Sequence, residues 1–242
     1  LTQATATPTA TPVGDTPTAT IPPPFATVAL GLAENPLILA LPPSANSQAQ
    51  IDAVKVIASQ FTERTGYTVV TVIPDSYSAL IDALENGNAH IVILDPYAYE
   101  LAFQRDLVRA SYAVLKDGEG KYGAQFLATR RGGFTSYYDE RTNENTTEEA
   151  AIALAQFADK KPCWSDEFSA SGYVIPLGYL NENRIVTKPA AFVEGHPTVV
   201  RSLYASGICD FGATYIDARK FPSLEDEFPD LVEQVMVVWQ IP

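Results

Sequence analysis

Residues 67–99, YTVVTVIPDSYSALIDALENGNAHIVILDPYAY, contain the pattern that decides the fold. The β-branched run at 67–74 and the run HIVILDP at 90–96 indicate two buried strands. The segment between them is predicted to be a helix with four apolar residues on one face: Tyr77, Leu80, Ile81 and Leu84. A strand, a helix and a second strand in this order predict parallel strands joined by a right-handed crossover.

The same pattern extends upstream. Residues 36–41, PLILAL, indicate a short buried strand, and residues 49–66 a helix that ends at Gly66. In a β-α-β-α-β unit of this kind, ligands collect beyond the carboxyl ends of the strands. The loops PDSY and LDPYAY leave that edge, so their three tyrosines, Tyr77, Tyr97 and Tyr99, are candidates for lining a small-molecule site. Ordinary packing at two helix starts would explain these tyrosines as well.

Composition limits the classes of partner. The chain has 242 residues, 46% of them hydrophobic, which is enough for a sizeable core. Its net charge of −13 comes from 29 acidic and 16 basic residues without a basic run. This argues against nucleic acid or an anionic membrane surface as the partner and favours a small ligand or a protein. No apolar run is long enough to cross a bilayer, and no signal peptide opens the sequence.

The first 24 residues, LTQATATPTATPVGDTPTATIPPP, are almost entirely Thr, Ala and Pro. Such a composition cannot bury enough apolar area to fold, and proline stiffens it into a stalk. Tethers of this kind join a surface anchor to an extracytoplasmic domain, so we expect an exported protein, periplasmic or at the cell surface. Any membrane anchor would then lie N-terminal to this chain. A cytoplasmic interdomain linker would have a similar composition.

The stretch FSASGYVIPLGYL at 168–180 places Ser169 and Ser171 at a predicted helix start, followed by Gly172. Glycine lets the backbone approach a ligand closely, and unpaired amides with the helix dipole point at the same spot. The pattern predicts an anion site. An N-cap would account for one serine but not for both.

A second helix start follows in EGHPTVVRSLYASGICDFGATY at 194–215. His196 precedes Pro197 at an early helical position, where it can donate a hydrogen bond to an anion. Asp210 lies in the next predicted strand, either as an ordinary strand-end acid or as an acceptor for the ligand. Cys163 and Cys209 are the only cysteines and lie near two strand starts, so they form either a disulfide or two buried thiols.

Four motifs in order resemble a known family: SYSALIDAL, LDPYAY, FSASGYVIPLGYL and GHPTVVRSLYASGICDFGATY. The chain from about residue 36 to its end is similar to the phosphate, phosphite and phosphonate-binding proteins of ABC importers. The resemblance implies a two-lobed α/β fold of the type II periplasmic binding protein class, with a mixed, mainly parallel sheet in each lobe and the ligand between the lobes. It implies no cofactor and no metal, and it implies the membrane subunits of an ABC transporter as partners.

In that family a serine-rich turn holds the phosphoryl oxygens, a histidine and an aspartate complete the site, and tyrosines close over it. The resemblance therefore implies a ligand site of six residues: Tyr77, Tyr99, Ser169, Ser171, His196 and Asp210. Three positions depart from the family pattern, namely Ala170 in place of a hydroxyl residue, Pro197 in place of an acid, and Asp95 in place of glycine. If Asp95 faces the cleft, it would repel a phosphonate or attract a cationic ligand tail.

The expected domains are the stalk at 1–24, lobe one at 25–112 and lobe two at 113–232. Residues 111–133 are expected to form two strands around an Asp-Gly turn at the crossover between the lobes. Residues 233–242, which include VMVVWQIP, are expected to return to lobe one as a strand. In the resembled family further helices follow that return, so we expect a C-terminal truncation that leaves part of lobe one uncovered.

Two other functions remain open. A ligand-sensing domain that signals to a partner would use the same pocket. A serine hydrolase would need Ser169 or Ser171, His196 and Asp210 to form a triad, but no G-x-S-x-G motif surrounds either serine. Two histidines and two cysteines disfavour a His/Cys metal site, whereas a carboxylate site stays possible.

Overall fold

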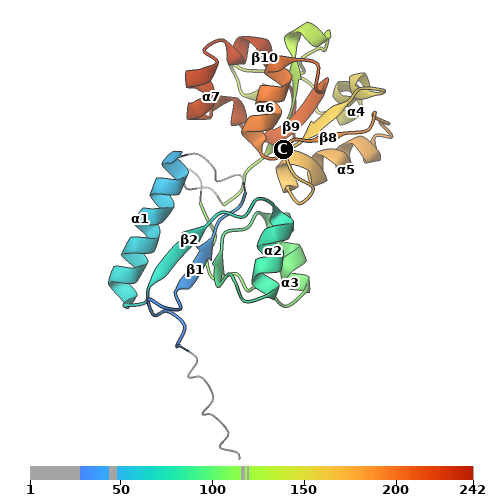
Figure 1. Cartoon of the computed structure of the whole chain (residues 1–242). Helices are drawn as coiled ribbons and strands as arrows, with labels where there is room; N and C mark the ends of the chain where they lie inside the picture. Colours follow the sequence, from blue (N-terminus) through green and yellow to red (C-terminus); the bar gives the residue numbers. More distant parts are fainter. Residues whose placement is uncertain (1–27, 44–47, 116–117, 119, 242) are drawn as a thin grey trace, which may run out of the picture.

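The computed structural model describes residues 28–43, 48–115, 118 and 120–241. The predicted stalk at 1–24 lies outside these residues. The described chain forms two bodies, each with its own sheet: one is coloured blue to green and the other light green to red (Figure 1). We call the first body lobe one and the second lobe two. None of the helices in the described segments is long and apolar enough to cross a membrane.

Lobe one is the β-α-β-α-β unit that the sequence predicts. Its three strands are all parallel and lie in the order β2-β1-β3. Helix α1 covers one side of the sheet, and α2 and α3 cover the other (Figure 1). The elements are β1 (Leu37–Ala40), α1 (Gln48–Thr65), β2 (Val69–Val72), α2 (Tyr77–Glu85), β3 (Ile91–Val92) and α3 (Pro96–Gln104).

Only part of the apolar face of α1 is buried. Val54 and Ala58 are buried against the sheet, as the helical spacing predicts. Ile57 and Phe61, which the same spacing assigns to this face, are 50% and 39% exposed. Helical spacing alone does not tell how wide a stripe the neighbouring sheet covers, and a three-stranded sheet covers a narrow one.

The connection between the lobes is not the hairpin that we expected. Residues 107–115 form neither helix nor strand, and Tyr112 is 97% exposed. Only the second half of the predicted hairpin is a strand, β4 (Ala124–Thr129), and its partners come from much later in the chain. An Asp-Gly turn favours a hairpin locally, but here long-range pairing prevails over it.

Lobe two is built on a five-stranded mixed sheet in the order β10-β4-β9-β7-β8. Strand β7 is parallel to both β8 and β9, whereas β4 is antiparallel to β9 and β10. The strands are β4, β7 (Pro162–Trp164), β8 (Ala191–Phe192), β9 (Phe211–Tyr215) and β10 (Val235–Ile241), with a small separate pair β5 (Tyr138–Asp139) and β6 (Glu144–Asn145).

The helices of lobe two lie on both faces of this sheet. On one face, Phe157 stacks on Phe211 with ring centroids 4.0 Å apart, and on the other face Val199 and Leu203 are fully buried. The helical segments are η1 (Arg130–Gly132), α4 (Ala150–Leu154), η2 (Ala155–Phe157), the π-helical turn η3 (Ala170–Val174), α5 (Ile175–Glu182), α6 (His196–Ala205), η4 (Ala218–Lys220), α7 (Pro222–Glu227) and α8 (Leu231–Gln234).

The expectation that residues 233–242 return to lobe one is wrong for the described part of that segment. Strand β10 pairs antiparallel with β4, with Val235 opposite Thr129 and Ile241 opposite Ala124. Its side chains belong to the two apolar clusters of lobe two. The sequence VMVVWQI is apolar throughout, which predicts a buried strand but does not specify the sheet that buries it. The boundaries predicted for the two lobes stay predictions.

The two cysteines form a disulfide, which sequence reasoning left open. Cys163 lies in β7 and Cys209 lies two residues before the first residue of β9, and their Cα atoms are 5.6 Å apart. Because β7 and β9 are parallel neighbours, the two residues near their starts are brought within bonding range. The bridge closes a loop that spans 46 positions and contains η3, α5 and α6.

Replacing Cys163 and Cys209 together by alanine should lower the free energy of unfolding by about 2–4 kcal/mol, because the loop is no longer constrained in the unfolded chain. Chemical denaturation followed by fluorescence measures this, with the wild type under reducing conditions as a second test of the same bond. Equal midpoints for wild type and variant under oxidising conditions would contradict the stabilising role of the bridge.

Candidate ligand-binding site

The backbone of Ser165, at the carboxyl end of β7, holds two helix starts together. Its N–H donates to the carbonyl oxygen of Gly172 at 3.3 Å, and its carbonyl oxygen accepts from the N–H of Gly195 at 2.9 Å. Gly172 lies in η3 and Gly195 is the N-cap of α6. The start of each helix is therefore fixed against the same strand end.

Both glycines are required at these positions. A Cβ on Gly172 would collide with the Ser165 side chain and lie 3.0 Å from Cε1 of His196. Gly195 has a φ of 95°, a conformation that side-chain-bearing residues rarely adopt, and His196 follows it directly. Close packing at one helix start and backbone freedom at the other thus bring the serine-rich turn and the histidine together.

A pocket of about 290 Å³ lies between the lobes at this point. Lobe one contributes the loops that follow β1 and β2 together with the start of α2, and lobe two contributes the two helix starts. The residues that line it are Pro43, Ile73, Pro74, Asp75, Tyr77, Ser165, Asp166, Ser169, Glu194, Gly195 and His196. Its volume is near the lower end of the range for small-molecule pockets, which favours a small ligand.

The pocket contains buried polar atoms with which a ligand could form hydrogen bonds. Ser169 Oγ accepts a hydrogen bond from Gly172 N at 3.1 Å and lies 3.5 Å from His196 Nε2. Among the described residues, the buried atoms Ser165 Oγ and His196 Nδ1 have no hydrogen-bond partner. Buried polar atoms without partners are rare and point to a ligand or water that completes them.

His196 is neutral at physiological pH. Burial lowers its pKa to about 4, because a charged imidazolium would be removed from water. Its ring packs edge-on against Tyr215, with centroids 4.7 Å apart. A neutral imidazole carries one N–H, so His196 can donate one hydrogen bond to an oxyanion without a formal positive charge.

The charged side chains around the pocket are acidic. Asp75, Asp166 and Glu194 line it, and none of its described lining residues is Lys or Arg. Burial raises the pKa of Asp166, and the nearby carboxylates Glu167, Asp95 and Glu194 raise it further. Binding of an anion here has to rely on hydrogen bonds from hydroxyls, amides and the neutral histidine.

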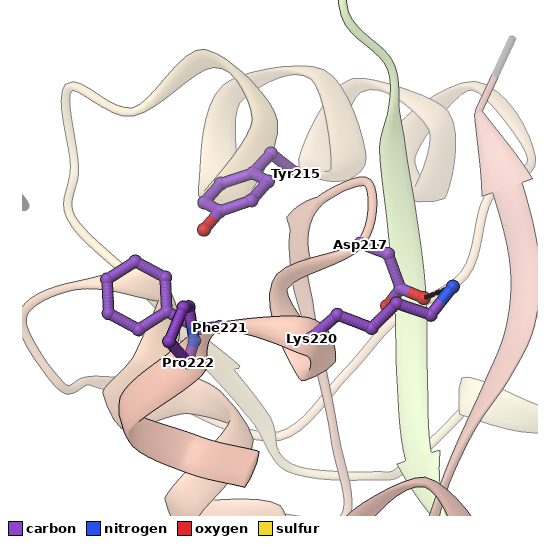
Figure 2. A pocket seen from close by; sticks show the side chains of 5 residues that line it. All are labelled: Tyr215, Asp217, Lys220, Phe221 and Pro222. Atoms are coloured by element: carbon purple, nitrogen blue, oxygen red, sulfur yellow. Dashed lines mark ion pairs between the residues drawn. The ribbon is translucent and has the colours of Figure 1, made fainter. Parts of the chain in front are cut away.

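A second hollow, of about 440 Å³, lies in lobe two and is lined by Tyr215, Asp217, Lys220, Phe221 and Pro222. Figure 2 shows the Tyr215 hydroxyl over the space between Phe221 and Lys220, with the Lys220 side chain turned toward Asp217. The Lys220 Nζ is 3.2 Å from Asp217 Oδ2, so this cation is already paired. The hollow is open and has no buried polar atom without a partner among its described residues, which makes it the weaker candidate for an anion.

Comparison with known proteins identifies the family. The family model for the periplasmic phosphonate substrate-binding proteins of ABC transporters matches residues 39–242. The chain belongs to this family. Members of the family bind substrates for transport and are not enzymes.

Three relatives with a determined role or structure have low sequence identity to this chain. The phosphate-import protein PhnD of Mycolicibacterium smegmatis is 26% identical over 228 residues, which are 90% of this chain and 66% of that protein. PhnD1 of Prochlorococcus marinus, solved in complex with methylphosphonate, has a TM-score of 0.70 at 15% identity over 85% of this chain and 72% of its own. A phosphonate transporter binding protein of Pseudomonas aeruginosa has a TM-score of 0.65 at 18% identity over 85% and 65%. These structures support the two-lobed α/β fold predicted from the sequence.

The structure brings three of the six predicted site residues into one pocket, namely Tyr77, Ser169 and His196. Ser171 is buried within η3, two residues after Ser169, and does not line the pocket. Tyr99 lies one turn into α3, where its ring stacks on Phe103 with centroids 5.7 Å apart, and it does not line the pocket either.

Asp210 lies at the wrong end of its strand for the predicted role. Its Oδ2 accepts from the N–H of Lys161 at 2.7 Å, next to the start of β7. The pocket is at the other end, because Ser165 follows β7 and Tyr215 ends the parallel strand β9. The five residues of β9 separate the two ends by about 15 Å. Asp210 is therefore the ordinary strand-end acid of the two alternatives.

Sequence reasoning missed Ser165, Tyr215 and Tyr122. Ser165 follows strand β7 and Tyr215 is the last residue of strand β9, so both lie at the edge of the sheet where ligands collect. The rule that selects the tyrosines of lobe one therefore also selects these two residues. Tyr122 lies just before β4 and had no such signal. Removal of its hydroxyl from water, followed by the negative charge of Asp95, raises its pKa to about 12.

The geometry does not form a hydrolase triad. Ser169 and His196 approach each other, but Asp210 is at the far end of β9 and His196 Nδ1 has no partner among the described residues to orient the ring. Ser169 Oγ also serves as the cap of η3. In the described part of the chain, no group of three His, Cys, Asp or Glu side chains could hold a metal ion.

Gly172→Ala in η3 should disrupt this site, whereas Gly178→Ala in the following α5 should not. The new Cβ at 172 would approach Ser165 Cβ to 2.8 Å and force the strand end and helix start apart, whereas nothing lies within 4 Å of a Cβ at 178. We expect Gly172→Ala to lower the free energy of unfolding by about 1–3 kcal/mol, the range for overpacking. Gly178→Ala should raise it by up to about 1 kcal/mol through helix propensity. Denaturation of both variants tests this, and equal effects would contradict the close approach.

Acidification should destabilise the protein through His196. Because its folded-state pKa of about 4 is below the ordinary 6.5, the unfolded chain takes up the proton first as the pH falls. The contribution is complete above about pH 6.5 and is lost toward pH 4, by up to about 3 kcal/mol. Burial raises the pKa values of Asp95 and Asp166, so their protonation at low pH favours the folded chain and opposes the effect of His196. The stability difference between wild type and His196→Gln across this pH range isolates the histidine, and parallel profiles would contradict its burial as a neutral group.

Proposed function

We propose that this protein is the extracytoplasmic solute-binding component of an ABC importer and binds a small phosphonate, phosphite or phosphate-like oxyanion between its lobes. The observation that carries this proposal is the pair of buried atoms Ser165 Oγ and His196 Nδ1, which have no partner among the described residues and belong to one inter-lobe pocket. Family membership supports the transport role, and the chain spans 66% of the length of its mycobacterial phosphate-import relative.

The proposed ligand contacts come from both lobes. The side chains of Ser165, Ser169 and His196 donate to the oxyanion from lobe two, together with amides at the start of η3. Tyr77 contributes from lobe one, where it is buried at the start of α2 and lines the same pocket. Ser171, which is buried in η3 but does not line the pocket, is proposed to lie at the edge of the site. Contacts from two lobes favour a closed state when the ligand binds.

The size and charge of the pocket limit the ligand. A volume of about 290 Å³ suits an ion of the size of phosphite or methylphosphonate. Because its donors are neutral and three lining side chains are carboxylates, a ligand with one negative charge should be preferred to one with two.

Calorimetric titration with phosphate, phosphite, methylphosphonate and 2-aminoethylphosphonate, with sulfate as a control, tests the function. Each of Ser165→Ala, Ser169→Ala and His196→Ala should weaken the best ligand by about 1.5–3 kcal/mol, the range for a hydrogen bond to a charged group. Asp210→Asn should leave the affinity unchanged, because Asp210 lies at the other end of the sheet. Binding of no member of the panel above sulfate would contradict the proposal, and unchanged affinity in all three alanine variants would contradict the site.

An importer component and a ligand sensor differ in the partner on which the loaded protein acts. Ligand-loaded protein should stimulate ATP hydrolysis by the cognate membrane transporter reconstituted in vesicles, because the binding protein delivers its ligand in the closed state. A protein that binds the oxyanion but leaves the ATPase rate unchanged would instead favour the ligand-sensing alternative.

A further inference from the structure

One carboxylate joins the two lobes at the serine-rich turn. Asp95 caps α3 in lobe one, where its Oδ1 accepts from Tyr97 N at 3.1 Å and from Ala98 N at 2.9 Å. Its second oxygen, Oδ2, accepts from Ala170 N in lobe two at 3.1 Å. A single side chain thus satisfies backbone donors at a helix start in each lobe.

The amide that Asp95 holds adjoins the proposed anion site, because Ala170 follows the pocket-lining Ser169. Ala170 is the first residue of η3 and lies between Ser169 and Ser171. The first amides of a helix have no acceptor within the helix, and they are the groups with which helix starts bind anions. The carboxylate of Asp95 is itself an anion, so an acid of the chain occupies an amide of the kind that binds anions.

The loop before η3 makes a second contact with lobe one. Phe168 packs against the apolar cluster of lobe one that contains Tyr77, Leu80 and Ala98. Asp166 Oδ1 accepts from Phe168 N at 2.7 Å and thereby orders this loop. The polar bond from Asp95 and the apolar contact of Phe168 act on the same few residues, so the lobes are tied together at the serine-rich turn.

The charge of Asp95 opposes an incoming anion. Its three hydrogen bonds all come from backbone amides, and Asp166 and Tyr122 are electrostatic neighbours that carry no positive charge. A phosphonate at Ser169 and His196 would lie near this carboxylate, because Asp95 binds the amide of Ala170, the residue next to Ser169. The setting is partly buried, so water and salt screen little of the repulsion.

We propose that Asp95 is an internal competitor of the oxyanion: in the absence of ligand its carboxylate holds the Ala170 amide and ties the lobes together, and the ligand displaces it. The proposal rests on the proposed function of the same pocket. It makes Asp95 a residue that sets affinity by occupying a donor, whereas Ser169 and His196 set it by contacting the ligand.

Asp95→Ser tests this proposal while preserving α3. Serine is a good N-cap and keeps one oxygen for Tyr97 N and Ala98 N, but it lacks the arm that reaches Ala170. The affinity for the best oxyanion of the panel should rise about tenfold, the equivalent of one hydrogen bond to a charged group. Small-angle scattering without ligand should give a larger radius of gyration for the variant than for the wild type. The thermal midpoint checks that the variant is folded.

Asp82→Ser is the matched control, because it removes a carboxylate from an exposed position on α2 of the same lobe. Its affinity should stay within about twofold of the wild type, since a distant exposed charge is screened. Unchanged or weaker binding in Asp95→Ser would overturn competition, and an unchanged radius of gyration would overturn the tie between the lobes. Failure of the wild type to bind any oxyanion would instead overturn the proposed function, because scattering without ligand tests the tie independently.

Discussion

The two backbone hydrogen bonds of Ser165 are the constraint on which the candidate site depends. They attach η3 and α6 to the end of one strand, although these helix starts are separated along the chain by the whole of α5 and β8. The attachment is possible because position 172 is glycine and leaves room for the Ser165 side chain. Without it, Ser169 and His196 would not be held side by side, and the part of the pocket that lobe two contributes would not form.

Lobe two is braced around this point by long-range bonds. The disulfide from Cys163 to Cys209 joins the starts of β7 and β9. Near the end of β9, the buried guanidinium of Arg219 binds Asp217 at 3.0 Å, Glu140 at 2.9 Å and the carbonyl oxygen of Val235 at 3.1 Å. Strand β9 is thereby fixed near both of its ends, and a rigid scaffold is what a binding site of few, well-placed donors needs.

The proposed binding of an anion by an acidic chain is compatible with the distances involved. A net charge of −13 spread over the surface is screened beyond a Debye length of about 8 Å, whereas the hydroxyls, amides and imidazole of the pocket would act at hydrogen-bond range. The carboxylates close to the pocket, Asp95 above all, are the charges that matter for the ligand. In the proposed site they would reduce the affinity that the donors alone would supply and restrict the charge that the ligand can carry.

The local patterns of the sequence determined the β-α-β-α-β unit of lobe one, the serine-rich helix start and the helix start at His196, because each depends on residues close together in the chain. Tertiary structure alone decided the rest. It placed Asp210 at the end of β9 away from the pocket, because strand direction and pairing are long-range properties. It put β10 in the sheet of lobe two, and it brought Cys163 to Cys209 through the pairing of β7 with β9. The reach of Asp95 to Ala170 spans 75 positions and depends on how the two lobes meet, which no local pattern records.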